Sequence, residues 1–286
     1  MAKSHKIKQV IKSTEKTAVI TKAMQVVSAS KLPSALDRFK STKPYADLAQ
    51  HIMAHYSHAS EHPFFQKRSD AKKTGLIILS SDRGLCGSLN LQLFKKALHH
   101  LQDQESSQQH VVLSVSGRKG LQFFSKHADI LSSVESLSDK PKIQQLMPLI
   151  TPMLDAYEEK ELDRVYIAYN QFENTLTQTP TIRQILPLQE EPNVKKTTTY
   201  HHEQEANTIL DMLLKNYIES TIYSCVTENI VSEQAARMIA MKNATDNAND
   251  IIADLNLTYN KIRQALITQE IAEISAGANQ STGETL

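Results

Sequence analysis

The feature that most constrains this chain is a stretch near its C-terminus, from Asn193 to Ala276, that contains neither glycine nor proline. These two residues destabilise a helix interior more than any others, so their absence over such a length favours one unbroken helix. At 1.5 Å per residue, that helix would be more than ~100 Å long. It needs a partner, because an isolated helix gains little stability from intrinsic propensity.

The apolar pattern of this stretch predicts that the partner is another helix. Residues spaced alternately three and four apart form a seam typical of a coiled coil: Ile252, Leu255, Tyr259, Ile262 and Leu266. Upstream, the seam consists mostly of small residues: Ala235, Ala236, Ile239, Ala240, Ala244 and Ala248. Small side chains allow a partner helix to approach closely.

The distribution of charge indicates which segment that partner is. The net charge is only +1, yet the segment Met1–Lys43 carries roughly +8 and the segment Glu203–Leu286 roughly −7. We therefore expect the N-terminal segment to lie antiparallel to the C-terminal helix. Nucleic acid is not an expected partner of the basic segment, because the segment lacks interleaved aromatic residues.

The N-terminal segment, residues 4–58, is itself expected to be helical. Its apolar residues recur at helical spacing: Ile7, Val10, Ile11, Ile20, Met24, Val27, Leu36, Phe39, Leu48 and Ile52. Pro33 and Pro44 are expected to kink or interrupt this helix.

The middle of the chain has a different character, because five of the seven glycines lie between Gly75 and Gly120. Short apolar runs such as "TGLIILSSDRG", "HVVLSVSG" and "DRVYIAYNQF" predict strands, and amphipathic helices are predicted between them. The run "TPTIRQILPL" predicts an edge strand, where proline is tolerated. Alternating strands and helices predict a mostly parallel sheet with both faces covered.

Composition excludes several classes of protein. The sequence has no run of eighteen or more apolar residues, so no transmembrane helix is expected. No apolar segment of a secretory signal follows the N-terminus, and the basic start fits a structural helix better than a transit peptide. Cys86 and Cys225 are too few for a disulfide scaffold and fit a reducing compartment.

The loop "SSDRGLCGSLN", residues 80–90, is the most distinctive candidate site. It follows a predicted strand and opens a helix, where α/β sheets often bind phosphate groups. However, it matches neither GxGxxG nor the P-loop pattern. Cys86 beside Arg83 would suit a thiolate of low pKa, but no histidine is evidently placed as its base. A tight turn at a subunit or domain contact is the favoured interpretation.

Four histidines share one face of a predicted helix: His51, His55, His58 and His62. Histidines at this spacing can bind zinc, but no carboxylate or cysteine ligand accompanies them, which favours a solvated face. Cys225 lies among apolar residues and is expected to be a packed side chain. The sequence therefore predicts no catalytic, cofactor-binding or metal-binding residue.

Three stretches, in order along the chain, resemble the gamma subunit of the F-type ATP synthase: "ITKAMQVVSASKL", "SSDRGLCGSLN" and "SEQAARMIAMKNATDNANDII…YNKIRQALITQEIAEI". The resemblance implies a long antiparallel coiled coil of N- and C-terminal helices with an inserted Rossmann-like α/β domain. The expected boundaries are a first shaft helix over 1–60, the α/β domain over 70–192, a second shaft helix over 203–276, and a frayed tail over 277–286.

The resemblance also implies a function. In that family the coiled coil enters a hexamer of three alpha and three beta subunits, and the lower part forms a foot on the membrane ring of c subunits, where it holds the epsilon subunit. Ion flow turns the ring and the shaft, and the shaft drives catalysis on the beta subunits. The chain would then be a non-catalytic, peripheral subunit at the cytoplasmic face of a bacterial inner membrane, without a cofactor.

Particular residues acquire expected roles from the same resemblance. Arg263 and Gln264 match positions that meet a catch loop of the beta subunit, and Lys22 and Met24 match positions facing its lever. The foot region is matched by Asp82, Arg83, Gly84, Cys86, Gly87 and Glu203. The shaft surface is expected to be mostly non-adhesive, because a large apolar patch would trap one rotary position.

The chain departs from the family at Val19, where lysine is usual, and at Pro33, which should kink the shaft. Two alternatives stay open. One is a nucleotide- or thiol-using α/β enzyme with a helical oligomerisation arm, which would need a phosphate-binding loop. The other is a generic coiled-coil tether, which would not need the inserted α/β domain.

Overall fold

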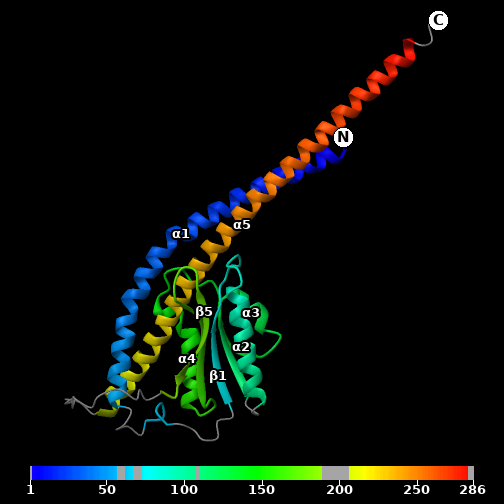
Figure 1. Ribbon diagram of the computed structural model, residues 1–286. Coiled ribbons are helices and arrows are strands. Elements are labelled where there is room, and N and C mark those ends of the chain that lie inside the picture. Colours follow the sequence, from blue (N-terminus) through cyan, green and yellow to red (C-terminus); the bar gives the residue numbers. More distant parts are fainter. Residues whose placement is uncertain (1, 57–61, 67–72, 107–109, 189–205, 283–286) are drawn as a thin grey trace. The chain divides into compact units, whose positions relative to one another are not determined.

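The computed structural model describes residues 2–56, 62–66, 73–106, 110–188 and 206–282 (Figure 1). Side chains are described throughout these ranges except at 2–4, 43, 45–56, 105–106, 206–210 and 275–282. The chain forms two compact units. Unit 1 consists of Met1–Val27 and Ile239–Leu286, and unit 2 consists of Ser28–Met238.

Two long helices dominate the chain: α1, Ala2–Tyr56, and α5, Ala206–Thr282. The expected interruption of α1 is wrong, because the helix runs through both Pro33 and Pro44. A proline inside a helix costs about 3 kcal/mol. Packing offsets this cost, since Leu32 and Ala35 on either side of Pro33 are buried against α5. The helix α5 also continues to Thr282, into the segment that was expected to be frayed.

In unit 1 the two helices form the predicted coiled coil. On α5, each of the five predicted seam residues, from Ile252 to Leu266, is half-buried, whereas their neighbours on the helix are mostly exposed. On α1, the least exposed residues of 5–27 also recur three and four apart: Ile7, Ile11, Thr14, Ala18, Thr21, Met24 and Gln25. The seam is thus continuous but only partly apolar.

Several large apolar side chains of unit 1 are exposed. Three apolar residues that share the helical spacing on α1 face outward, with Val10, Ile20 and Val27 exposed by 44%, 60% and 51%. Further large aliphatic side chains of unit 1 are exposed as well: Val19, Val26, Ile251, Leu257, Ile267, Ile271 and Ile274. Single exposed apolar side chains are common on protein surfaces, so the non-adhesive shaft stays a prediction.

Unit 2 contains the predicted sheet. Its strands are β1 (Lys73–Leu79), β2 (His110–Ser116), β3 (Asp129–Val134), β4 (Arg164–Phe172) and β5 (Gln178–Leu186). Their order is β3-β2-β1-β4-β5, and every neighbouring pair is parallel except β4 with β5. The proline-containing β5 is an edge strand, as predicted.

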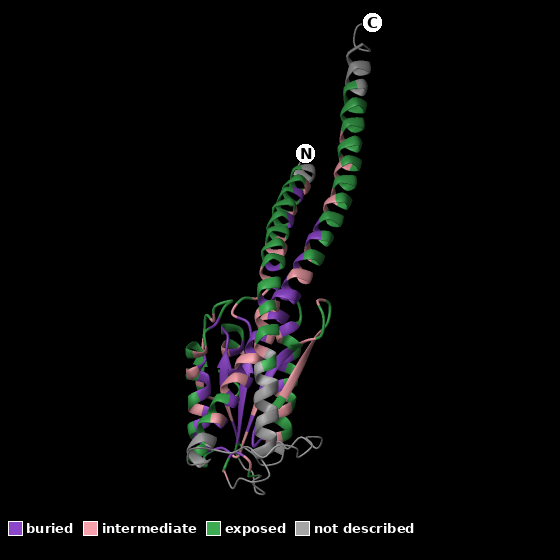
Figure 2. Cartoon of the chain, turned by 90° about the vertical axis from the view of Figure 1, so that its left-hand side faces the viewer, coloured by how far each residue is buried: buried purple, intermediate pink, exposed green. Residues whose placement is uncertain are grey.

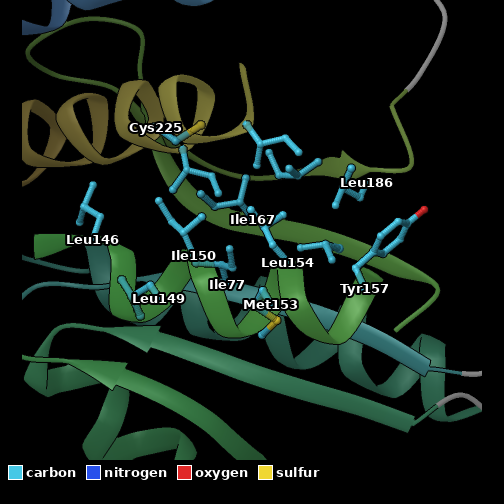
Figure 3. Close-up of a cluster of buried hydrophobic side chains, with 14 of the residues drawn as sticks. Ile77, Leu146, Leu149, Ile150, Met153, Leu154, Tyr157, Ile167, Leu186 and Cys225 are labelled. Carbon is cyan, nitrogen blue, oxygen red and sulfur yellow. The ribbon is translucent and has the colours of Figure 1, made fainter. Parts of the chain in front are cut away.

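Helices cover both faces of this sheet (Figure 1). On one face, the larger core is enclosed by α4 (Met147–Glu158) and by the segment of α5 from Leu214 to Val226 (Figure 3). A short 3₁₀ helix, η1 (Ile143–Gln145), precedes α4. On the other face, α2 (Leu89–Ser106) and α3 (Arg118–Phe124) enclose the second core. Cys225 is 3% exposed in the larger core, which confirms that it is a packed side chain. Figure 2 shows the central strands almost wholly buried.

Candidate functional site

The carboxyl ends of β1, β2 and β3 are joined by one carboxylate. Asp82 follows β1, and its Oδ1 accepts hydrogen bonds from the backbone N–H of Arg118, at 3.0 Å, and of Ser136, at 2.9 Å. Arg118 begins α3 after β2, and Ser136 follows β3. Asp82 therefore holds three successive connections together.

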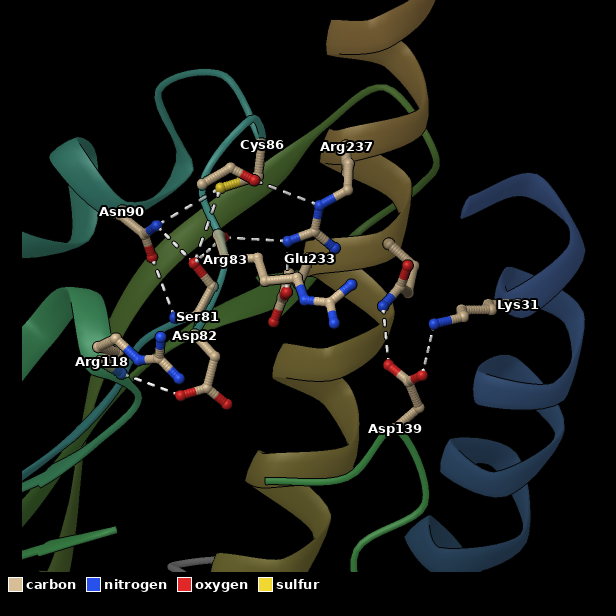
Figure 4. A network of polar contacts seen from close by, with 12 residues as sticks. Lys31, Ser81, Asp82, Arg83, Cys86, Asn90, Arg118, Asp139, Glu233 and Arg237 are labelled. Atoms are coloured by element: carbon tan, nitrogen blue, oxygen red, sulfur yellow. Dashed lines mark hydrogen bonds and ion pairs between the residues drawn. The ribbon is translucent and has the colours of Figure 1, made fainter. Parts of the chain in front are cut away.

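The loop from Ser81 to Asn90 is closed by its own side chains (Figure 4). The Asn90 amide accepts a hydrogen bond from the Ser81 backbone N–H at 3.2 Å and donates to the Ser81 hydroxyl at 2.7 Å. The Ser81 hydroxyl in turn donates to the Arg83 carbonyl at 2.8 Å. Leu85 lies at φ 63° and is 57% exposed, so the loop displays an apolar side chain on strained backbone.

A close approach between the backbones at Ser80 and Gly117 supports the loop. Gly117 has φ +92°, and a Cβ there would lie 2.2 Å from the Ser80 carbonyl oxygen. The Ser80 hydroxyl donates to the Ser116 carbonyl at 2.8 Å and accepts from the Gly120 N–H at 2.8 Å. Only glycine fits at 117, because any side chain would meet the backbone of the neighbouring connection.

Arg237 of α5 attaches the loop to the long helix (Figure 4). Its guanidinium donates to the carbonyl oxygens of Arg83, at 3.1 Å, and Gly84, at 3.3 Å. It also forms an ion pair with Glu233, one turn earlier, at 2.5 Å. The side chains of Arg237 and Glu233 are only 8% and 16% exposed, so both are largely removed from water.

The proposed thiolate at Cys86 is not supported. The side chain is 3% exposed and packs with Leu89 and with Ala236 of α5. Burial raises the pKa of the Cys86 thiol, an effect that Glu233 reinforces and Arg237 opposes. A nucleophilic cysteine needs a lowered pKa, so this residue serves packing rather than chemistry.

Helix α5 occupies the position at which an open α/β sheet usually binds a ligand. That position lies outside the carboxyl ends of the strands, where the strand order reverses, which here is between β1 and β4. Arg237 contacts the loop after β1, while Asn229 and Ser232 of the same helix bond to the backbone of Asn170 on β4. The chain's own helix therefore fills the crevice that the enzyme interpretation requires.

The residues expected to meet the beta subunit all lie in unit 1. Lys22, Arg263 and Gln264 are exposed, and Met24 is half-buried. The Lys22 ammonium donates to Gln25 on its own helix at 3.2 Å. These side chains are accessible to a partner, with Met24 beside the coiled-coil seam.

Of the expected foot residues, the loop Asp82–Gly87 lies against Arg237 of α5, whose guanidinium donates to the carbonyls of Arg83 and Gly84. Glu203 lies outside the described residues. The expected foot therefore stays a prediction.

The histidine stripe offers no metal site within the described part of the chain. His62 Nε2 forms a hydrogen bond with the Asp211 carboxylate of α5 at 2.8 Å, and no cluster of three potential ligands occurs among the described residues. His58 and the side chains of His51 and His55 lie outside the description.

Sequence reasoning missed Glu233 and Arg237, and also Asp139, which links both long helices to the loop after β3. The Asp139 carboxylate accepts from Lys31 of α1 at 2.7 Å and from Gln234 of α5 at 3.2 Å (Figure 4). The spacing of Glu233 and Arg237 by four residues within an alanine-rich segment was an available signal for a buried ion pair.

Comparison with known proteins agrees with this architecture. A family model described as ATP synthase matches residues 3–280. The ATP synthase gamma chain of Methylobacillus flagellatus is 43% identical over 288 residues, covering 97% of this chain and 99% of that protein. The chain belongs to the ATP synthase gamma chain family. The gamma chain of Coxiella burnetii is also similar, with 44% identity over 285 residues and the same coverage.

Solved structures confirm the gamma-chain fold over the full length. A chain of the Euglena gracilis mitochondrial ATP synthase, in a structure of OSCP, F1 and the c-ring, has a TM-score of 0.75 at 20% identity. It is covered to 97%, and this chain to 100%. A chain of the rotor of the same enzyme has a TM-score of 0.67 at 18% identity, with 93% of this chain and 99% of that chain covered. No helix in the described ranges is long and apolar enough to cross a membrane.

Proposed function

We propose that the chain is the rotor subunit of the central stalk of an F-type ATP synthase. It couples ion flow through a membrane c-ring to ATP synthesis or hydrolysis in a hexamer of alpha and beta subunits. The observation that carries this proposal is the 43% identity over 97% of the chain to an ATP synthase gamma chain. The coiled coil of unit 1, whose five seam residues on α5 from Ile252 to Leu266 are half-buried, supports a shaft.

The chain itself is proposed to be non-catalytic. The crevice between β1 and β4 holds Arg237, Asn229 and Ser232 of α5, and the Cys86 thiol is buried with a raised pKa. Both observations weigh against the nucleotide- or thiol-using enzyme. ATP turnover would then belong to the beta subunits of the complex.

The proposed contacts fall into two groups. Lys22, Met24, Arg263 and Gln264 are proposed to face the beta subunits, and the region of Glu203 is proposed to face the c-ring and epsilon. The loop Asp82–Gly87, which Arg237 holds against α5, is proposed to belong to the same foot. A photo-crosslinker at Leu85 identifies its partner, because beta, epsilon and c subunits differ in mass.

The proposed location is the cytoplasmic face of a bacterial inner membrane, where the chain is held peripherally through the c-ring. The bacterial gamma chains at 43% and 44% identity support this location. Fractionation of membranes with and without a c-subunit deletion tests it, since the chain should leave the membrane when the ring is missing.

Reconstitution tests the function itself. The purified chain is mixed with alpha and beta subunits of the same organism, and the products are analysed for size and for ATPase activity. We expect one assembly whose sustained ATP hydrolysis requires this chain. Assembly of alpha and beta with a different gamma chain, while this one stays apart, would contradict the proposal.

A further inference from the structure

Strand β4 continues past the strand beside it. The pairing of β1 with β4 ends at Ala168, whereas β4 runs on to Phe172 alongside β5. Within the described residues, no strand covers the β1 side of β4 beyond Ala168. The backbone groups of the last residues of β4 on that side need other hydrogen-bond partners.

Helix α5 supplies those partners through side chains. The Asn229 Oδ1 accepts from the backbone N–H of Asn170 at 3.0 Å and from its side-chain amide at 3.0 Å. The Ser232 hydroxyl donates to the Asn170 carbonyl at 2.8 Å. Glu228 accepts from the N–H of Phe172 at 3.1 Å. We call these contacts of Glu228, Asn229 and Ser232 with β4 the α5 lock.

The bonds of the lock to Asn170 are buried, so they cannot be exchanged readily for bonds to water. Asn170, Asn229 and Ser232 are exposed by only 1%, 5% and 0%. Both backbone groups of Asn170 face α5 rather than β5, since its N–H donates to Asn229 and its carbonyl accepts from Ser232. If the lock opened, buried donors and acceptors would be left without partners, which is costly.

The hydrogen bonds of the lock restrain the rotation of α5, which the neighbouring apolar core does not. Ile222, Cys225 and Val226 bury α5 against the sheet, but apolar attraction is non-directional and tolerates small rotations of the helix. A shift of α5 by one residue turns each side chain by about 100° and would remove all bonds of the lock at once. The lock therefore fixes both the register and the rotation of α5 relative to β4.

We propose that the α5 lock transmits torque between the α/β layer and the long helix, with Asn229 and Ser232 as positioning residues. This inference rests on the proposed rotor function. In a rotor the c-ring acts on the lower part of the molecule, and the beta subunits resist at the shaft. A twisting load between these points acts on the bonds that prevent α5 from turning against the sheet.

The test compares two substitutions with matched controls in the assembled, membrane-bound synthase. Asn229→Ala is compared with Asn216→Ala, because Asn216 is exposed on the same helix. Ser232→Ala is compared with Ser220→Ala, because the Ser220 hydroxyl donates to Tyr217 of its own helix. The measured quantity is the number of protons pumped per ATP hydrolysed, at increasing opposing proton gradient.

We expect both lock variants to assemble and to hydrolyse ATP, while their pumping per ATP falls as the opposing gradient rises. At the highest gradient the loss should reach about fivefold, the factor that corresponds to one lost buried hydrogen bond. Both controls should follow the wild-type chain at every gradient.

Four outcomes would overturn or redirect the inference. Wild-type pumping by both variants at the highest gradient would overturn it. Failure of both variants to assemble would assign the contacts to folding and would equally overturn it. If only Asn229→Ala fails to assemble, Ser232→Ala decides. A wild-type chain that does not join alpha and beta would instead reject the rotor function itself.

Discussion

Thr21 of α1 and Thr245 of α5 are 224 positions apart in the sequence, yet their hydroxyl oxygens lie 2.8 Å apart in the coiled coil of unit 1. Each hydroxyl also lies within reach of a carbonyl of its own helix, Thr21 at 3.1 Å from Ala18 and Thr245 at 2.8 Å from Met241. Because a hydroxyl has a single hydrogen, one threonine donates across the seam and the other donates to its own helix. The seam at this level is therefore polar but fully satisfied. Two helices of opposite charge meet here without an ion pair between the described side chains of unit 1.

We predict that this threonine pair is coupled. Thr21→Val or Thr245→Val alone should lower the free energy of unfolding by about 1 kcal/mol, because one hydroxyl loses its partner across the seam. The double variant should be less destabilised than the sum, since two apolar side chains then face each other. Thermal unfolding followed by circular dichroism measures the cycle. Thr17→Val, on the exposed side of α1, should change little, and strict additivity would contradict the coupling.

Loss of Arg237 should expose Cys86. Arg237→Ala removes the donors that hold the Arg83 and Gly84 carbonyls, and hydrogen bonds to a charged group contribute about 1.5–3 kcal/mol. We expect alkylation of Cys86 by a maleimide to become about tenfold faster, because the loop opens more often. Lys242→Ala, at an exposed position on α5, is the control variant.

Cys225 is the control within the same molecule. Burial raises the pKa of its thiol to about 12, so its alkylation should stay slow in every variant. Equal rates at Cys86 in the wild-type chain and in Arg237→Ala would show that the guanidinium does not hold the loop.

Stability should depend on pH through His100. Its ring lies 4.9 Å from the ring of Tyr166, its Nε2 is buried without a hydrogen-bond partner, and burial lowers the pKa of His100 below 6.5. The unfolded chain therefore binds the proton first, and the free energy of unfolding falls as the pH drops below 6.5. His100→Phe should flatten this part of the profile in urea titrations, whereas His99→Phe on the exposed side should not.

Glycine should be required at 117 and dispensable at 84. Gly117→Ala places a Cβ 2.2 Å from the Ser80 carbonyl oxygen at φ +92°, so we expect a loss of more than ~2 kcal/mol. At Gly84 the nearest atom to a new Cβ is Lys119 Cε, at 3.8 Å. Gly84→Ala should therefore leave the midpoint of denaturant unfolding almost unchanged. Similar midpoints for the two variants would refute the close approach.

Much of the fold followed from periodicity and composition. The absence of glycine and proline predicted the long C-terminal helix, and alternating spacings of three and four identified the seam from Ile252 to Leu266 that is half-buried in the structure. The parallel sheet and its edge strand β5 were predicted because each strand carries its own local signal. These properties depend on residues that are near one another in the sequence, so they can be predicted without knowledge of distant contacts.

Other properties depend on neighbours far away in the sequence. The helix α1 passes through Pro33 because Leu32 and Ala35 are buried against Val231 and Ala235 of α5, and this packing overrides the local preference. The apolar spacing on α1 predicted a helix, but the partner helix selects a seam through Ala18 and Thr21 and leaves Ile20 exposed. Apolarity alone does not say which face of a helix a partner will cover.

The sequence by itself determined that the chain has two long helices around an α/β sheet, because helix and strand periods are local properties. Only the tertiary structure decided that α5 fills the crevice between β1 and β4, through Arg237, Asn229 and Ser232. Each of these side chains bonds to backbone groups of distant residues. Backbone donors and acceptors are nearly the same in every residue, so no sequence pattern predicts which backbone group a distant side chain will bond.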